Sequence, residues 1–324
     1  MTRRVDISYK TIIFITVFLI SLWVLFLIMD VILLLLISFI LMSAFAPLVD
    51  RLVKWRVPKP AAIGLIFVLF IGGVAGILTV GLTPLINETS NLVRSLTESL
   101  SVFLQVNLVD QSVIQNELSK FSGQIIDLTL NLFDFILRFV TVLVITFYLL
   151  LDREHIEERV AALFVSHRGR AEKLIKDIES KLGAWLRGQM ILSVVIAVSV
   201  YIGLTIIGLD YALPLAIIAG LLEIIPIIGP IIAAAPAVLI AFTTSVPLAV
   251  IVGIMYAVIQ QLESNIVVPQ LMKRAVGLNP LLIIIAITVG GRLLGVGGAL
   301  LAVPIAVVIQ VVAQEILSPA QTSG

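Results

Sequence analysis

A single carboxylate stands in an apolar stretch that also contains several helix-breaking residues. The stretch runs from Leu221 to Pro236 and holds Glu223, Pro226, Gly229 and Pro230. Proline removes a backbone donor and clashes with the preceding turn, so a helix should break here. In hydrocarbon, a broken helix is tolerated only where protein or a water-filled cavity covers the freed groups. A carboxylate at that depth costs about 3 kcal/mol unless it is paired, hydrated or protonated.

These properties favour a transport site in which Glu223 binds a solute or a coupling ion. In the alternative interpretation, Glu223 lies at a membrane surface and the prolines form a tight turn between two short helices. The stretch alone does not decide between them.

Further polar residues recur at the joints of the carboxy-terminal half. Gln261, Glu263 and Asn265 precede Pro269, and Arg292 stands alone in a glycine-rich break after Pro280. A lone arginine in apolar surroundings seeks an acid, so we expect Arg292 to approach Glu223 or Glu263. The alternative is that Arg292 extends its charge to a membrane interface.

The elements that must position these residues are short. After residue 189 the apolar pieces cover residues 190–209, 211–222, 231–242, 247–259, 281–289 and 299–312. Several are too short to cross a bilayer as single helices. They are typical of the discontinuous or re-entrant helices that form transporter binding sites.

Composition places the chain in a membrane. It has 324 residues, of which 60% are hydrophobic and 13% are charged, whereas soluble domains carry about a quarter charged residues. The net charge of +1 argues against nucleic acid as a partner. There is no cysteine, and the two histidines, His155 and His167, lie in a charged stretch. We therefore expect no metal site and no cofactor.

The amino-terminal half predicts four longer spans. The apolar run from Ile12 to Val49 is long enough for two, with Asp30 expected at the turn of a tight helical hairpin. Residues 61–82 and 135–151 supply the third and fourth. Together with the carboxy-terminal pieces, this predicts an all-α polytopic membrane protein as one integral domain over residues 1–324.

Two polar segments interrupt the spans. Residues 83–132 are acidic overall and have helical apolar stripes, which predicts a helical extracytoplasmic insertion. It either forms a subunit contact or, as we favour, packs on its own membrane domain. Residues 152–189 predict a cytoplasmic amphipathic helical segment along the membrane surface, with most charges solvated. Positive residues concentrate in cytoplasmic loops, so the basic amino terminus is expected in the cytoplasm.

Four motifs carry a resemblance to the autoinducer-2 exporter (AI-2E) family of membrane transporters. They are Trp185-Leu-Arg-Gly-Gln189, Leu222-Glu-Ile-Ile-Pro-Ile-Ile-Gly-Pro230, Gln261-Leu-Glu-Ser-Asn-Ile-Val-Val-Pro-Gln270, and Val276-Gly-Leu-Asn-Pro280 leading into Gly290-Gly-Arg-Leu-Leu-Gly295. The resemblance implies about eight membrane spans, a homo-oligomer such as a pentamer, and transport without a nucleotide-binding domain. It adds Arg187 and Gln189 to the candidate binding residues. Asn279 departs from the family pattern, which often has histidine there, so a proton-handling role at that position is unsupported.

The sequence contains no Gly-x-x-x-x-Gly-Lys-Ser/Thr loop, no His-Glu-x-x-His pair and no Gly-x-Ser-x-Gly elbow. We therefore expect a transporter of the inner or plasma membrane rather than an enzyme. The leading hypothesis is export of a small polar solute, such as an autoinducer-2-like signal, by facilitated or ion-coupled transport. The second hypothesis is a Na⁺(Li⁺)/H⁺ antiporter, and the third is a non-transporting membrane scaffold.

Overall fold

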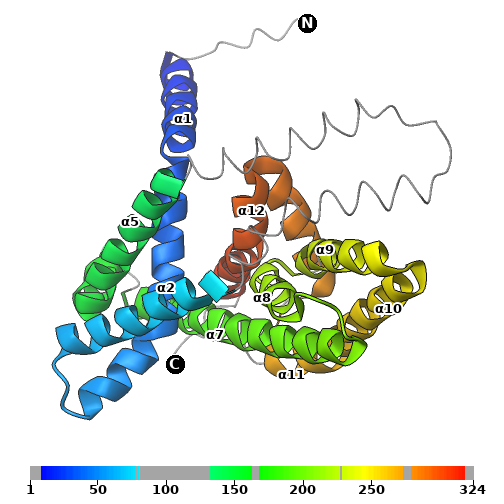
Figure 1. Cartoon of the computed structure of the whole chain (residues 1–324). Helices are drawn as coiled ribbons and strands as arrows, with labels where there is room; N and C mark the ends of the chain where they lie inside the picture. Colours follow the sequence, from blue (N-terminus) through cyan, green and yellow to red (C-terminus); the bar gives the residue numbers. More distant parts are fainter. Residues whose placement is uncertain are drawn as a thin grey trace, which may run out of the picture.

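The described part of the chain is built from α-helices. The computed structural model describes residues 9–77, 79–80, 132–162, 168–226, 228–272, 277 and 279–317, and within them there is no strand (Figure 1). The predicted 83–132 insertion lies outside these residues except for its last position. The helices are α1 (Tyr9–Leu27), α2 (Met29–Lys54), an unlabelled helix over Lys59–Ile77, α5 (Leu132–Leu151), α6 (Arg153–Ala162), α7 (Arg168–Ile207), α8 (Ala212–Leu222), α9 (Ile228–Thr244), α10 (Val246–Leu262), the π-helix η2 (Glu263–Val267), α11 (Val268–Met272) and α12 (Pro280–Leu317).

Helix length and composition confirm the polytopic membrane fold. Six of the described helical segments are long and apolar enough to cross a membrane, and three shorter apolar helices accompany them. Two of the short ones are α8, with 11 residues, and α9, with 17. At 1.5 Å per residue, α8 covers only about half of a hydrocarbon core.

The expected helical hairpin at Asp30 is wrong. Only Ile28 separates α1 from α2, and its N–H and carbonyl continue the helical hydrogen bonds to Val24 and Ile32. Figure 1 shows α1 extending from the end of α2, beyond the rest of the described helices. One acid in the first turn of a helix is favourable and does not reverse the chain. No glycine, proline or asparagine stands beside Asp30 to make a turn.

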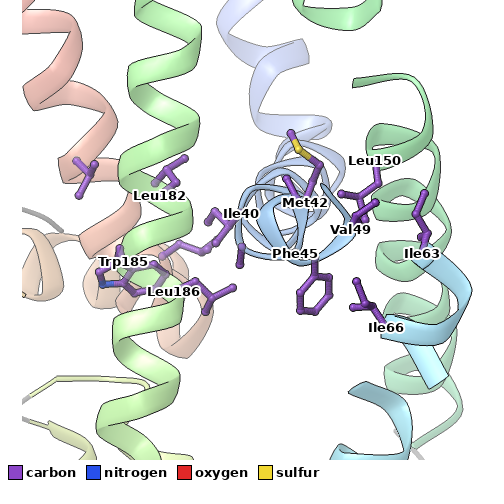
Figure 2. Packing of buried hydrophobic residues seen from close by; sticks show 14 of the residues in the cluster. Ile40, Met42, Phe45, Val49, Ile63, Ile66, Leu150, Leu182, Trp185 and Leu186 are labelled. Carbon is purple, nitrogen blue, oxygen red and sulfur yellow. The ribbon is translucent and has the colours of Figure 1, made fainter. Parts of the chain in front are cut away.

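The first hydrophobic cluster joins α2 to the middle of α7. In Figure 2, Leu182 and Leu186 of α7 lie on the side toward Ile40 of α2, and Phe45 of α2 points the other way, toward Ile66. The apolar stripe of residues 152–189 therefore packs against protein, and its position along the membrane surface stays a prediction. The same helix continues without interruption into the apolar segment, so that α7 spans 40 residues.

The second cluster joins α7, α8, α9 and α10 through small side chains. Ala219, Ala233, Ala237 and Ala241 are all 0–1% exposed. A Cβ added at Gly220 of α8 would lie 2.7 Å from the Ser193 carbonyl oxygen of α7. Small residues let membrane helices approach this closely, and the short helices α8 and α9 are thereby held against α7.

Helix α12 is a helical hairpin. Gly295 has φ 62° and ψ −143°, which is not helical. On either side of it, Gly290 and Gly298 approach so closely that a Cβ on either would overlap the other's carbonyl group. Residues eight apart in a straight helix would be about 12 Å apart, so the chain must reverse at Gly295. This re-entrant form agrees with the discontinuous helices expected in the carboxy-terminal half.

Candidate functional site

The chain is interrupted between the end of α8 at Leu222 and the start of α9 at Ile228. Helix α8 ends at Leu222, and α9 begins at Ile228, so that Pro230 lies in the first turn of α9, where proline is tolerated. Pro226 lies in the intervening turn. A Cβ at Gly229 would overlap the Leu222 carbonyl oxygen. Only glycine therefore allows the two helices to meet this closely.

Glu223 is at the carboxyl end of α8 and is 0% exposed. It is therefore covered by protein rather than by solvent. Neither of its carboxyl oxygens has a hydrogen-bond partner. A buried carboxyl without a donor cannot remain there as a free anion at low cost, because desolvation strongly disfavours an uncompensated charge.

Gln189 connects the interruption to α7. It is 1% exposed, and its Nε2 donates a hydrogen bond of 2.6 Å to the main-chain carbonyl of Glu223. The last carbonyls of a helix lack helical donors and need another partner. Two predicted site residues therefore meet, and the contact is through the backbone of Glu223 rather than its carboxyl group.

Glu263 supplies the second buried acid. It is the first residue of the π-helix η2 and is 5% exposed. Its side chain interacts with that of Glu223 across the α8–η2 contact. A π-helical turn is rare and is frequently found at functional sites. Here it precedes Pro269, so the proline that was expected to break this span is accommodated by a local change of helix type.

Buried oxygen atoms without a donor among the described residues belong to the acid pair and to the helix face that leads to Glu263. They are Oε1 and Oε2 of Glu223, Oε2 of Glu263, Oε1 of Gln260 and the hydroxyl oxygen of Tyr256, all buried. Tyr256, Gln260 and Glu263 follow one another at i, i+4 and i+7, so they share one face of α10 and η2. The arrangement can hold a proton between the two carboxyls or coordinate a small cation with oxygen ligands. Sequence analysis left Tyr256 out, although its spacing from Glu263 could have identified it.

Gln261 and Asn265 lie near the pair but face away from it. Both are exposed, and Asn265 Nδ2 donates to the Gln261 carbonyl and side-chain oxygens at 2.9 and 3.2 Å. The structure therefore separates them from the buried oxygens, and their predicted role in binding keeps only the support of the motif.

The expected ion pair of Arg292 is not formed. Arg292 is exposed and lies three residues before the turn of the α12 hairpin. It makes no ion pair with any residue in the described ranges, and both oxygens of Glu223 lack partners. Its exposure agrees with the alternative in which the charge extends outward. Pro280 begins α12, with Asn279 Oδ1 accepting from the Leu281 N–H at 2.9 Å as in an N-cap.

Arg187 satisfies a second helix irregularity, in α2. Pro47 lies inside α2 and has no N–H, so the Ser43 carbonyl four residues earlier loses its helical donor. Arg187 Nη1 donates to the carbonyls of Ser43 and Ala44 at 3.2 and 3.3 Å. A Cβ at Gly183 would overlap the Ser43 carbonyl oxygen, which shows how closely α7 approaches α2 here.

Arg153 is the centre of an ion cluster that joins α2, α6 and α7. Its guanidinium group lies 3.2 Å from Asp50, 3.3 Å from Glu157 and 2.7 Å from Glu179. Burial lowers the pKa of Arg153, but the Glu179, Asp50 and Glu157 carboxylates outweigh it, so the pKa lies above its ordinary value. The expectation that the charges of residues 152–189 are mostly solvated therefore fails for Arg153 and for Glu179, which is 5% exposed.

Together the fold and the site define a polytopic α-helical membrane protein with a buried pair of acids beside an interrupted helix. Residues 12–318 match the model of the AI-2E family transporters. The chain belongs to this family and is therefore a multi-pass membrane transport protein, which confirms the resemblance in the motifs.

Relatives cover most of the chain. It is 30% identical to YrrI of Bacillus subtilis (strain 168) over 86% of this chain and 84% of that protein. It is 31% identical to YueF of the same organism over 85% of this chain and 81% of that protein. It is also 23% identical to PerM of Escherichia coli (strain K12), over 70% of this chain and 67% of that protein. YrrI and YueF are provisionally named as transport proteins, and PerM is provisionally named as a permease.

Proposed function

We propose that this protein exports a small polar solute, such as an autoinducer-2-like signal, and couples export to an ion gradient at the Glu223–Glu263 pair. The observation that carries the proposal is the burial of two neighbouring carboxyl groups that form no ion pair with a basic side chain of the described residues. Two such groups cannot both stay ionised in apolar surroundings, because like charges and desolvation both oppose it. The pair must therefore take up a proton or a cation, and releasing it to the other side of the membrane would drive transport.

The energy available is adequate for coupling. A membrane potential of 100 mV supplies about 2.3 kcal/mol per elementary charge, which is more than a tenfold accumulation. The interrupted helix and the π-helix hold the two acids on separate elements, α8 and η2, so a small movement of either would change their separation. Binding of one ion would favour the close arrangement, and its loss would favour the separated one.

The proposal is tested with the purified full-length protein in liposomes loaded with autoinducer-2. We expect release to rise with the amount of protein and to accelerate when a pH gradient is imposed. Glu223→Gln and Glu263→Gln should each lose the response to the gradient. Glu158→Gln, the same change at an exposed acid of α6, is the matched control and should behave as wild type. Unchanged gradient dependence in Glu223→Gln would remove the pair from the mechanism.

A second candidate function is Na⁺(Li⁺)/H⁺ antiport. The observation that favours it is the group of buried oxygens without donors, because alkali cations are bound by oxygen ligands. This function predicts proton movement, followed with a pH-sensitive dye inside the liposomes, when NaCl or LiCl is added without any organic solute. No dye response at any alkaline pH would reject antiport and leave solute export.

We place the protein in the plasma membrane with a cytoplasmic amino terminus, and we propose that it assembles as a homo-oligomer such as a pentamer. The placement is supported by the basic segments. The 50–59 connection and the start of α6 lie together, because Lys59 pairs with Glu154 at 3.8 Å and Arg153 with Asp50. The assembly rests on the family resemblance, and cross-linking in intact membranes would test it.

A further inference from the structure

A polar cavity lies on the opposite side of α7 from the Gln189–Glu223 contact. It has a volume of about 230 Å³ and opens between α2, α6 and α7. Side chains with donors and charges dominate its lining, which consists of Ser43, Pro47, Asp50, Arg153, Lys176, Glu179, Ser180 and Arg187.

Both acidic side chains of the lining are engaged by one basic side chain, that of Arg153. Asp50 and Glu179 both bind the Arg153 guanidinium. The Glu179 carboxylate accepts from two nitrogens of Arg153, Nε and Nη2. Such a bidentate pair is the strongest form of this contact. These two carboxylates are therefore not free to attract a cation into the cavity.

The remaining cations have no acid partner in the described part of the chain. Among the described residues, Arg187 donates only through Nη1 and only to main-chain carbonyls, so its Nε and Nη2 have no acceptor there. Lys176 is exposed and forms no ion pair with a described residue. Arg51 adds a further positive charge that acts on Arg187. The lining has three basic side chains (Arg153, Lys176 and Arg187) and two acidic ones (Asp50 and Glu179), so its formal net charge is +1.

We propose that this cavity binds the carboxylate or phosphate group of a small anion through Arg187 and Lys176. The planar guanidinium fork suits two oxygens of one acid group, and the lysine adds a point charge. The volume fits a small solute, or the headgroup of an anionic lipid that enters from the bilayer. Both carry the same chemistry.

The position of the cavity connects it to the acid pair. Arg187 and Gln189 are two residues apart in α7, so their side chains point about 200° apart around the helix. Gln189 holds the backbone of Glu223, and Arg187 lines the cavity. The anion and the coupling ion would therefore lie on opposite sides of α7 at nearly the same height along the helix. This inference rests on the proposed function only in taking the anion to be the cargo.

The test measures binding, so it does not depend on transport. The full-length protein is placed in phosphatidylcholine nanodiscs, and inorganic phosphate binding is measured by calorimetry at low ionic strength, where charge attraction is least screened. We expect saturable binding that Lys176→Gln weakens about three- to tenfold. Arg187→Lys, which keeps the charge but loses the fork, should weaken it as well. The matched control is Lys173→Gln, at an exposed lysine of the same helix that does not line the cavity.

A second arm adds anionic phosphatidylglycerol to the nanodiscs. Phosphate binding that persists assigns the site to a free solute, and binding that disappears assigns it to a lipid headgroup; either result supports the anion site. Absence of phosphate binding in phosphatidylcholine, or equal weakening by Lys173→Gln, would overturn it. Glu223→Gln should bind phosphate normally even though its ion coupling is lost. Loss of binding in that variant would also count against this cavity, because Glu223 does not line it.

Discussion

Two contacts of α7 solve the same backbone problem in different ways. Toward α2, the charged Arg187 donates to the carbonyls of Ser43 and Ala44 beside Pro47. Toward α8, the neutral Gln189 donates to the carbonyl of Glu223 beside the α8–α9 interruption. Both side chains replace helical donors that an irregular helix has lost.

The difference lies in what surrounds each donor. Arg187 is half-buried and borders a polar cavity, where water can solvate a permanent charge. Gln189 is 1% exposed and lies beside an acid that has no counter-charge. An arginine at position 189 would give Glu223 a fixed partner and remove its need for a proton or cation. The neutral amide supports the interrupted helix and leaves the acid pair free to exchange an ion.

The largest loss of stability is expected when a methyl group is added where two helices approach closely, at the α8–α9 contact and at the α7–α2 contact. In Gly229→Ala and Gly183→Ala the new Cβ would overlap a backbone carbonyl, which cannot move aside as a flexible side chain could. We expect each variant to lose about 3 kcal/mol or more of stability, measured as the apparent melting temperature in detergent. Gly253→Ala is the control, because no atom lies within 4 Å of its added Cβ. Wild-type melting of Gly229→Ala would mean that α8 and α9 are not packed as described.

The next effect compares the two donors directly. Gln189→Leu leaves the buried Glu223 carbonyl without its donor and should cost about 1–3 kcal/mol. Arg187→Leu should cost less, because water in the adjoining cavity can reach the carbonyls that it exposes. Both are compared by thermal unfolding with Gln270→Leu, a change at an exposed glutamine that should be near neutral. A larger loss of stability in Arg187→Leu than in Gln189→Leu would contradict the view that water reaches the Arg187 contact and not the Gln189 contact.

The ion cluster of Arg153, which borders the polar cavity, should show non-additive losses of stability in a double-mutant cycle. Arg153→Gln leaves Glu179 buried without its partner, and after allowing for the partial exposure of Arg153 we expect a loss of about 1–2 kcal/mol. Adding Glu179→Gln should restore part of that stability, because it removes the charge that was left unpaired. Additive losses in the double variant, measured by the same thermal unfolding, would show that the pair does not act as a unit.

The smallest effect is expected at Arg292. Because this side chain is exposed and forms no ion pair with the described residues, Arg292→Gln should change stability by less than about 0.5 kcal/mol. Gradient-driven transport should be retained in liposomes. A loss of coupling as large as that in Glu223→Gln would revive the expected pairing of Arg292 with the acids in another conformation of the transporter.

Much of the candidate site could be predicted from the residue types alone. The prolines and Gly229 located the interruption, and Glu223 and Glu263 stood out because carboxylates are rare in apolar segments. The errors have a common cause. The turn predicted at Asp30 does not form, and α2 was not predicted as the neighbour of the apolar stripe of residues 152–189, because local pattern does not say which neighbour covers a face. Arg292 was paired with an acid from charge alone, although its position before the turn of the α12 hairpin leaves it exposed.

The sequence by itself determined that this protein is an all-α membrane transporter with an acid beside a broken helix, because hydrophobicity and proline act locally and need no knowledge of distant residues. Only the tertiary structure decided which donor meets which carbonyl and that the two acids face each other. Those contacts join residues that are far apart in the chain, Ser43 with Arg187, Gln189 with Glu223, and Glu223 with Glu263. Their formation depends on separations of a few ångströms that are set by the packing of α2, α8 and η2 against α7 and α10.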